Sequence, residues 1–184
     1  MADAVHREIG PDQLLWMPAR HAPHKLDLQP ENADDRLSLL RAAVKDRKLE
    51  KVCDWEIRRP SPSFTIHTLR QLHEHDPKDR FDLILGLDSL EHLASWHRFE
   101  EILKLAGFLF LPRKGWSHQD VENFHANLAS NLRDQFRAKV IFMPLVPISS
   151  SQIREKLASG QPCDEMLPSE VLAEIKRCGL YQSG

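Results

Sequence analysis

Phe81-Asp82-Leu83-Ile84-Leu85-Gly86 has the composition of a buried strand that ends at a glycine turn. A second such stretch, Gly107-Phe108-Leu109-Phe110-Leu111-Pro112, ends at a proline. Neither alternates polar and apolar residues along its length, which is typical of strands covered on both faces. Between them, residues 89–105 repeat apolar positions at helical spacing, and we predict a helix in two pieces broken near Trp96. A buried strand, a helix and a second buried strand indicate a parallel sheet covered by helices.

The alternation of strands and helices continues outward in both directions. Further strands are predicted over residues 14–17 and 140–143, and over 53–57, where Cys53, Trp55 and Ile57 alternate with acidic residues. Further helices are predicted over residues 2–9, 34–44, 64–73, 121–136, 151–158 and 169–177. Ser63 or Thr65 is the expected cap of the helix that begins near residue 64. The sequence shows no linker or repeat, so we predict one α/β domain over residues 1–184.

The bulk properties exclude several classes of protein. A formal net charge of −2 over 184 residues gives no reason to expect binding to nucleic acid or to an anionic membrane. No apolar run approaches the ~20 residues of a membrane helix, and no secretory signal opens the chain. Cys53, Cys163 and Cys178 are far apart and odd in number, which favours free thiols in the cytoplasm. The sequence does not decide the oligomeric state, and a homo-oligomer stays among the alternatives.

Polar loops follow the predicted strands, at the edge where ligands bind in parallel sheets. They comprise residues 18–25, 58–63, 86–89, 113–115 and 147–151. The last loop ends in Ser149, Ser150 and Ser151, and Arg154 follows in the first turn of a predicted helix. This segment predicts a phosphate-binding site, because it combines the free backbone N–H groups of a helix N-terminus, serine hydroxyls and the N–H groups of an arginine guanidinium. The alternative is that a serine only caps the helix and that Arg154 is solvated.

Six short motifs occur in order along the chain. They are Ala22-Pro23-His24-Lys25, Pro62-Ser63-Phe64-Thr65 with Thr68-Leu69, Gly86-Leu87-Asp88-Ser89-Leu90 with Trp96, Arg113-Lys114-Gly115, Ile148-Ser149-Ser150-Ser151-Gln152-Ile153-Arg154, and Leu167-Pro168-Ser169-Glu170-Val171 with Gly179-Leu180-Tyr181. In this order the chain resembles the bacterial nicotinate-mononucleotide adenylyltransferases of the nucleotidyltransferase superfamily. The resemblance implies a Rossmann-like parallel sheet with helices on both faces. Within these six motifs the main departure is Phe64, which stands where the family has Tyr.

The resemblance implies adenylyl transfer from ATP to nicotinate mononucleotide, giving deamido-NAD and pyrophosphate in NAD biosynthesis. Mg²⁺ is expected with ATP and would be held largely by the phosphates, so no metal ligand is assigned to the protein. The implied ATP-binding residues are Ser149, Ser150, Ser151, Arg154, Gly86 and Asp88. The implied residues for the second substrate are His24, Lys25, Ser63, Phe64, Thr65, Trp96 and Arg113. Lys25 is the one candidate for a catalytic side chain.

Several of these residues also have a purely structural explanation. Trp96 could belong to the hydrophobic core, and His24 could lie in a solvated loop. Asp88 and Thr65 could each cap the N-terminus of a helix. These alternatives stay open at the level of the sequence.

The GGxFDPxHxGH segment of the family, whose two His contact the ATP phosphates, has no counterpart in this sequence. The predicted helix over residues 2–9 also lacks a capping residue and a preceding strand. We therefore expect that the first strand of the sheet is missing because a start codon was assigned too late, and that this chain is itself inactive or nearly so. The alternative is a non-catalytic member that binds a nucleotide or a partner. A transferase for another acceptor, such as phosphopantetheine, is less favoured because it would not keep the motifs at 62–65 and 86–96.

Overall fold

The computed structural model describes residues 1–20, 32–60, 62–145 and 148–181. They form two compact units, one of Met1–Pro11 with Phe64–Leu145 and one of Asp12–Ser63 with Val146–Gly184.

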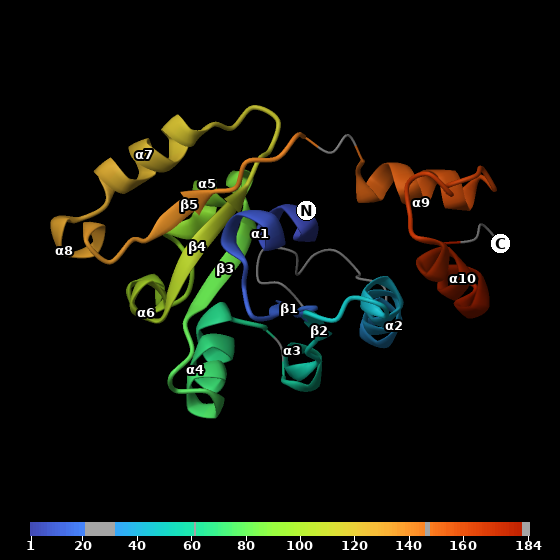
Figure 1. Cartoon of the computed structure of the whole chain (residues 1–184), viewed down its shortest axis with the longest axis horizontal. Coiled ribbons are helices and arrows are strands. Elements are labelled where there is room, and N and C mark those ends of the chain that lie inside the picture. Colours follow the sequence, from blue (N-terminus) through green and yellow to red (C-terminus); the bar gives the residue numbers. More distant parts are fainter. Residues whose placement is uncertain (21–31, 61, 146–147, 182–184) are drawn as a thin grey trace. The chain divides into compact units, whose positions relative to one another are not determined.

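The first unit is built on a three-stranded parallel sheet in the order β3-β4-β5 (Figure 1). The strands are β3 (Phe81–Gly86), β4 (Ala106–Leu111) and β5 (Ala138–Val140). Its helices are α1 (Ala2–Ile9), α4 (Thr65–His75), α5 (Leu90–Leu93), α6 (Phe99–Leu105), α7 (His118–Asn127) and α8 (Ser130–Arg133), with a 3₁₀ turn at Leu87–Ser89. Every residue of β4 is buried, and Phe108 and Phe110 form its core with Phe136. A central strand covered on both faces explains its uninterrupted apolar sequence.

The second unit holds the parallel pair β1 (Leu14–Trp16) and β2 (Glu50–Val52). Its helices are α2 (Ala33–Val44), α3 (Trp55–Arg58), α9 (Ser150–Ala158) and α10 (Ser169–Cys178). The Glu50 side chain is buried, and it accepts a 2.6 Å hydrogen bond from Trp16 Nε1 of the neighbouring strand and pairs with Arg47. A buried carboxylate needs such partners because an unpaired one is costly to desolvate.

The parallel pairing predicted from the sequence is confirmed, although the described strands form two sheets rather than one. The predicted strands at 81–86, 107–112 and 14–17 and the helices at 2–9, 34–44, 64–73, 151–158 and 169–177 lie within two residues of observed elements. The predicted break near Trp96 is also confirmed, because α5 ends at Leu93 and α6 begins at Phe99.

The predicted strand at 53–57 is wrong. Residues Trp55–Arg58 form the short helix α3, and the strand of this region lies earlier, at Glu50–Val52. Arg58 donates from its backbone N–H to the Asp54 carbonyl and from Nε to the Asp54 carboxylate, at 3.1 and 2.8 Å. This pair of contacts closes a helical turn that the alternation of apolar residues does not reveal.

Three further predictions need correction. The helix predicted over 121–136 breaks at Leu128, which has extended backbone and whose carbonyl accepts a hydrogen bond from Arg133 Nε. The strand predicted over 140–143 pairs instead at Ala138–Val140, because the register with β4 fixes the ladder. Neither Ser63 nor Thr65 caps α4, whose N-cap residue is Phe64 with no side-chain cap bond.

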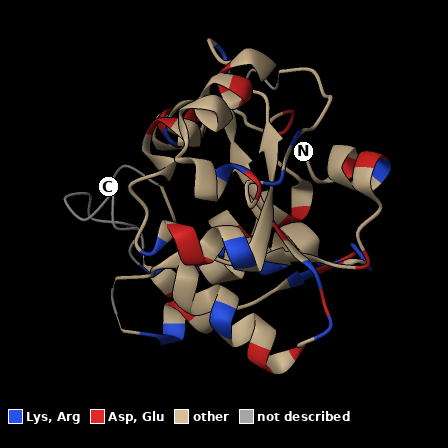
Figure 2. Cartoon of the chain, turned by 90° about the vertical axis from the view of Figure 1, so that its left-hand side faces the viewer, with Lys and Arg blue, Asp and Glu red and all other residues tan. Residues whose placement is uncertain are grey.

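The described residues contain no helix that could cross a bilayer, as judged by length and apolar content. Basic and acidic residues are interspersed over the ribbon in the view of Figure 2, in keeping with the small net charge.

Candidate functional site

Gly86, Asp88 and Arg113 meet at the carboxyl ends of β3 and β4. Gly86 lies opposite Leu111 in the parallel register, so the two strands end side by side. Asp88 follows β3 in the 3₁₀ turn, Arg113 follows β4, and Arg113 Nε lies 3.5 Å from Asp88 Oδ1. Both side chains are about half exposed, with 44% of Arg113 and 58% of Asp88 accessible. The structure thus brings together an acceptor and a cation at the ligand-binding edge of the sheet.

The absence of a side chain at Gly86 makes this meeting possible. A Cβ at Gly86 would lie 2.3 Å from Asp88 Oδ1 and 2.8 Å from Arg113 Nε, well inside contact distance. The alternative that Asp88 caps a helix is not supported, since the N-cap position of α5 is Ser89.

Phe64 and Trp96, both implied to bind the second substrate, come from neighbouring segments of the first unit. The ring of Phe64 lies 4.5 Å from the ring of His97, the residue after Trp96, and 5.8 Å from His67. Thr65 is the first residue of α4 and is partly exposed. The sequence did not point to His97, because no motif links rings 33 residues apart, and only the tertiary contact places it beside Phe64. His67 lies three residues after Phe64, so its contact follows from the spacing of the helix, although the motifs did not mark it.

A network of charges holds α4 against α6 next to Trp96. Glu101 accepts from Arg70 Nε at 2.6 Å and pairs with Arg98 Nε at 2.9 Å. The hydrogen bond from Arg70, more than the charge of Arg98, lowers the pKa of the Glu101 carboxyl. Arg98 itself has φ of 58°, a left-handed conformation that side-chain-bearing residues rarely adopt. The turn that carries Trp96 is therefore fixed by specific contacts rather than by local preference.

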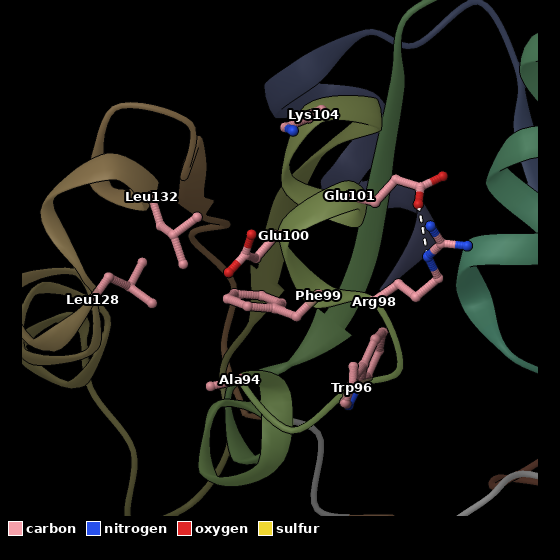
Figure 3. A pocket seen from close by; sticks show the side chains of 9 residues that line it. All are labelled: Ala94, Trp96, Arg98, Phe99, Glu100, Glu101, Lys104, Leu128 and Leu132. Carbon is pink, nitrogen blue, oxygen red and sulfur yellow. Dashed lines mark ion pairs between the residues drawn. The ribbon is translucent and has the colours of Figure 1, made fainter.

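A hollow of about 680 Å³ opens beside α6 (Figure 3). Phe99 lies between Leu128 and Leu132 on one side and Trp96 and Arg98 on the other. Among the predicted site residues that the structure describes, only Trp96 lines this hollow. Asp88, Arg113 and Phe64 lie outside it, so the hollow is not the centre of the predicted site.

In the second unit the serine segment opens α9. Ser149 is the N-cap and accepts a hydrogen bond from the Gln152 N–H at 3.2 Å, while the Gln152 side chain accepts from the Ser149 N–H. The capping alternative is thus right for Ser149, whose hydroxyl hydrogen remains available for donation. Ser150 and Ser151 are exposed in the first turn, and the Arg154 guanidinium lies 5.9 Å from the centre of the Tyr181 ring.

Ser63 is buried and serves as an anchor. Its Oγ accepts a hydrogen bond from the backbone N–H of Arg20 at 3.2 Å. The Arg20 carbonyl accepts from Arg36, and the Arg20 guanidinium donates to the carbonyl of Ile57. His24 and Lys25 lie outside the described residues. Within the described ranges, no three His, Cys, Asp or Glu side chains cluster as a metal cage would require.

Comparison with known proteins gives the same assignment as the motifs. The sequence profile of the family described as cytidylyltransferase-like matches residues 1–156. Proteins named "Probable nicotinate-nucleotide adenylyltransferase" from Dehalococcoides mccartyi and Gloeobacter violaceus are 33% and 34% identical, over 98% of this chain and 88% and 87% of their own lengths. The chain belongs to the nicotinate-nucleotide adenylyltransferases of the cytidylyltransferase-like family.

This family member also has solved structural neighbours. One is the Plasmodium falciparum nicotinic acid mononucleotide adenylyltransferase complexed with NaAD, with a TM-score of 0.70 and 16% identity over 97% of this chain and 87% of the other. At that identity the likeness establishes the α/β nucleotidyltransferase fold and no more. A second structure of the Plasmodium enzyme, complexed with APC, gives a TM-score of 0.69.

Proposed function

We propose that this adenylyltransferase joins ATP and nicotinate mononucleotide to form deamido-NAD and pyrophosphate. The observation that carries the proposal is the Asp88–Arg113 pair above Gly86, at the strand ends where this fold family binds nucleotides. An oxygen of the mononucleotide phosphate attacks the α-phosphorus of ATP. The bond from that phosphorus to the β-phosphate oxygen breaks, and pyrophosphate leaves.

The chemistry asks for alignment and charge neutralisation rather than a strong base. The attacking phosphate is already anionic at neutral pH, so positioned cations and N–H donors carry most of the catalytic effect. Ser150, Ser151 and Arg154 would hold ATP phosphates, and Lys25, with His24, would face the reacting phosphates. Ser149 would contribute its hydroxyl and the start of α9.

Asp88 would accept hydrogen bonds from ribose or adenosine hydroxyls. Its contact with Arg113 is an exposed ion pair, which is worth little in water, so the carboxylate can exchange this partner for a ligand. Trp96 would stack on the pyridine ring, and backbone N–H groups near Phe64 and Thr65 would bind the pyridine carboxylate.

The proposed ATP-binding residues Ser150, Ser151 and Arg154 offer hydroxyl and guanidinium groups, which suit phosphate oxygens, so we propose that the divalent ion arrives bound to the ATP phosphates. Mg²⁺ held in this way would neutralise phosphate charge while the protein supplies the surrounding N–H, hydroxyl and guanidinium groups. We further propose that the two units work as one nucleotidyltransferase domain, because the family match runs through both units. We also propose that the protein works in the cytoplasm, where its three free cysteines would stay reduced.

The test is to incubate the chain with ATP, Mg²⁺ and nicotinate mononucleotide, and to quantify deamido-NAD and pyrophosphate. Parallel reactions with nicotinamide mononucleotide and phosphopantetheine identify the acceptor. Equal release of both products with nicotinate mononucleotide supports the proposal, and preference for phosphopantetheine refutes it. Binding of both substrates without any product would support the assignment of the substrates and would agree with the expectation that this sequence, which has no counterpart of the GGxFDPxHxGH segment, is itself inactive. It would refute turnover by this chain.

A further inference from the structure

The C-terminal motif Gly179-Leu180-Tyr181 has no part in the function proposed so far. Helix α10 ends at Gly179, whose φ of 64° lets the chain reverse, and the N–H of Leu180 donates to the Ile175 carbonyl. Such a C-cap redirects the backbone after the helix. Tyr181, the single tyrosine of the chain, is the next residue.

Tyr181 has φ of 59°, so it occupies the left-handed region although it carries a large side chain. A residue stays in that region only when surrounding contacts hold it there, and such residues concentrate at functional sites. One contact of the Tyr181 side chain is with α9, because the Arg154 guanidinium lies over the Tyr181 ring at 5.9 Å from its centre. That distance is within the range of a cation–π interaction.

We propose that Tyr181 is a positioning residue that orients Arg154 for the phosphates of ATP, an inference that rests on the proposed function. The face of an aromatic ring attracts a guanidinium without occupying its N–H groups and without cancelling its charge. A carboxylate in the same place would do both. An aromatic support therefore suits an arginine whose N–H fork has to bind phosphate oxygens.

A double-mutant cycle tests this role through the affinity for MgATP, measured by titration calorimetry. Tyr181→Leu is expected to weaken ATP binding by roughly two- to fivefold, the strength of one exposed cation–π contact. The same change in an Arg154→Ala background is expected to have no further effect, since the two residues act as one unit. Tyr181→Phe keeps the ring face and is expected to restore the affinity.

Tyr181→Gly separates positioning from folding. It removes the ring and the cost of the left-handed backbone together, so the melting temperature should hold or rise while ATP affinity falls. Equal losses in both backgrounds, or a Tyr181→Phe protein as weak as Tyr181→Leu, would refute the inference alone. An Arg154→Ala protein with unchanged affinity would also refute it. An unmodified chain that binds no ATP would refute the proposed function, and this inference with it.

Discussion

Replacement of Gly86 by alanine should impair nucleotide binding while leaving the fold intact. The backbone at Gly86 has φ of −70° and ψ of 148°, which any residue adopts, so alanine adds no backbone strain. Its Cβ would lie 2.3 Å from Asp88 Oδ1 and 2.8 Å from Arg113 Nε. Both atoms belong to the ends of flexible, half-exposed side chains, which would move away from the methyl group.

The expected magnitudes differ sharply between stability and binding. Glycine to alanine at a compatible position stabilises by about 0.4–1 kcal/mol through the unfolded state, and loss of an exposed ion pair costs about 0–1 kcal/mol. The free energy of unfolding should therefore change by less than about 1 kcal/mol. A hydrogen bond to a charged group contributes about 1.5–3 kcal/mol, so displacing Asp88 from a bound nucleotide should weaken its affinity by roughly tenfold to a hundredfold.

Gly107→Ala provides a matched control at the opposite edge of the same sheet. A Cβ at Gly107 would lie 2.2 Å from Asp82 Oδ1, nearly the same clash with the same kind of atom, but at the start of β4. The assay is titration calorimetry with MgATP and with deamido-NAD, alongside urea unfolding of each variant. If Gly86→Ala binds both ligands like the unmodified chain, the Asp88–Arg113 pair is not part of the site. If both variants lose affinity equally, the loss comes from the sheet rather than from the site.

Three other changes have outcomes that the structure specifies. The hydrogen bond from Arg177 lowers the pKa of Glu174 to about 2. The ionised carboxylate therefore stabilises the fold fully above the pKa of about 4.3 that Glu has in the unfolded chain. This contribution is lost as the pH falls toward 2. Acid unfolding followed by circular dichroism should therefore show a smaller loss of stability over that range for Glu174→Gln, and an unchanged pH profile would contradict the assignment. Glu50→Leu leaves the Trp16 indole N–H without its acceptor and should lower the free energy of unfolding, measured in urea, by about 1–3 kcal/mol. An unchanged free energy of unfolding would show that water replaces the carboxylate. Trp96→Leu should lower the affinity for nicotinate mononucleotide by roughly two- to tenfold, because ring stacking is lost, and should leave the affinity for ATP unchanged. Equal losses of affinity for both ligands would argue against stacking.

The sequence predicted the two strands that have long apolar runs. The stretches at 81–86 and 107–112 coincide with β3 and β4 to within one residue. Continuous apolar sequence reflects continuous burial in β4, whereas β3 is only partly buried and its Asp82 is exposed, so the expected full burial of that strand is wrong. The prediction also failed at Trp55 and Ile57, whose spacing of two suits a strand. There the polar contacts between Asp54 and Arg58 decide the conformation, and periodicity carries no information about them.

The site was predictable residue by residue, but its geometry was not. Motifs pointed to Asp88 and Arg113 separately, whereas their meeting depends on the register that places Gly86 opposite Leu111. The contacts of Phe64 with His97 and of Arg154 with Tyr181 join segments about 30 residues apart. Such contacts follow from tertiary packing, and no local pattern in the sequence marks them.

The discontinuity of the second unit has a consequence for the order in which the protein folds during synthesis. Helix α2 packs against α10 through Ser38, which donates to Glu174, and these residues are 136 positions apart. The strands β3, β4 and β5 are all synthesised before α10, so residues 12–63 wait for their partner after the chain of the first unit has been made. At 5–20 residues per second, the 136 residues from Ser38 to Glu174 take roughly 7–30 s to synthesise. This interval is long enough for a chaperone to bind the unpaired face of α2. The slow step of biogenesis is thus expected to be the docking of the last helix rather than the formation of the sheet.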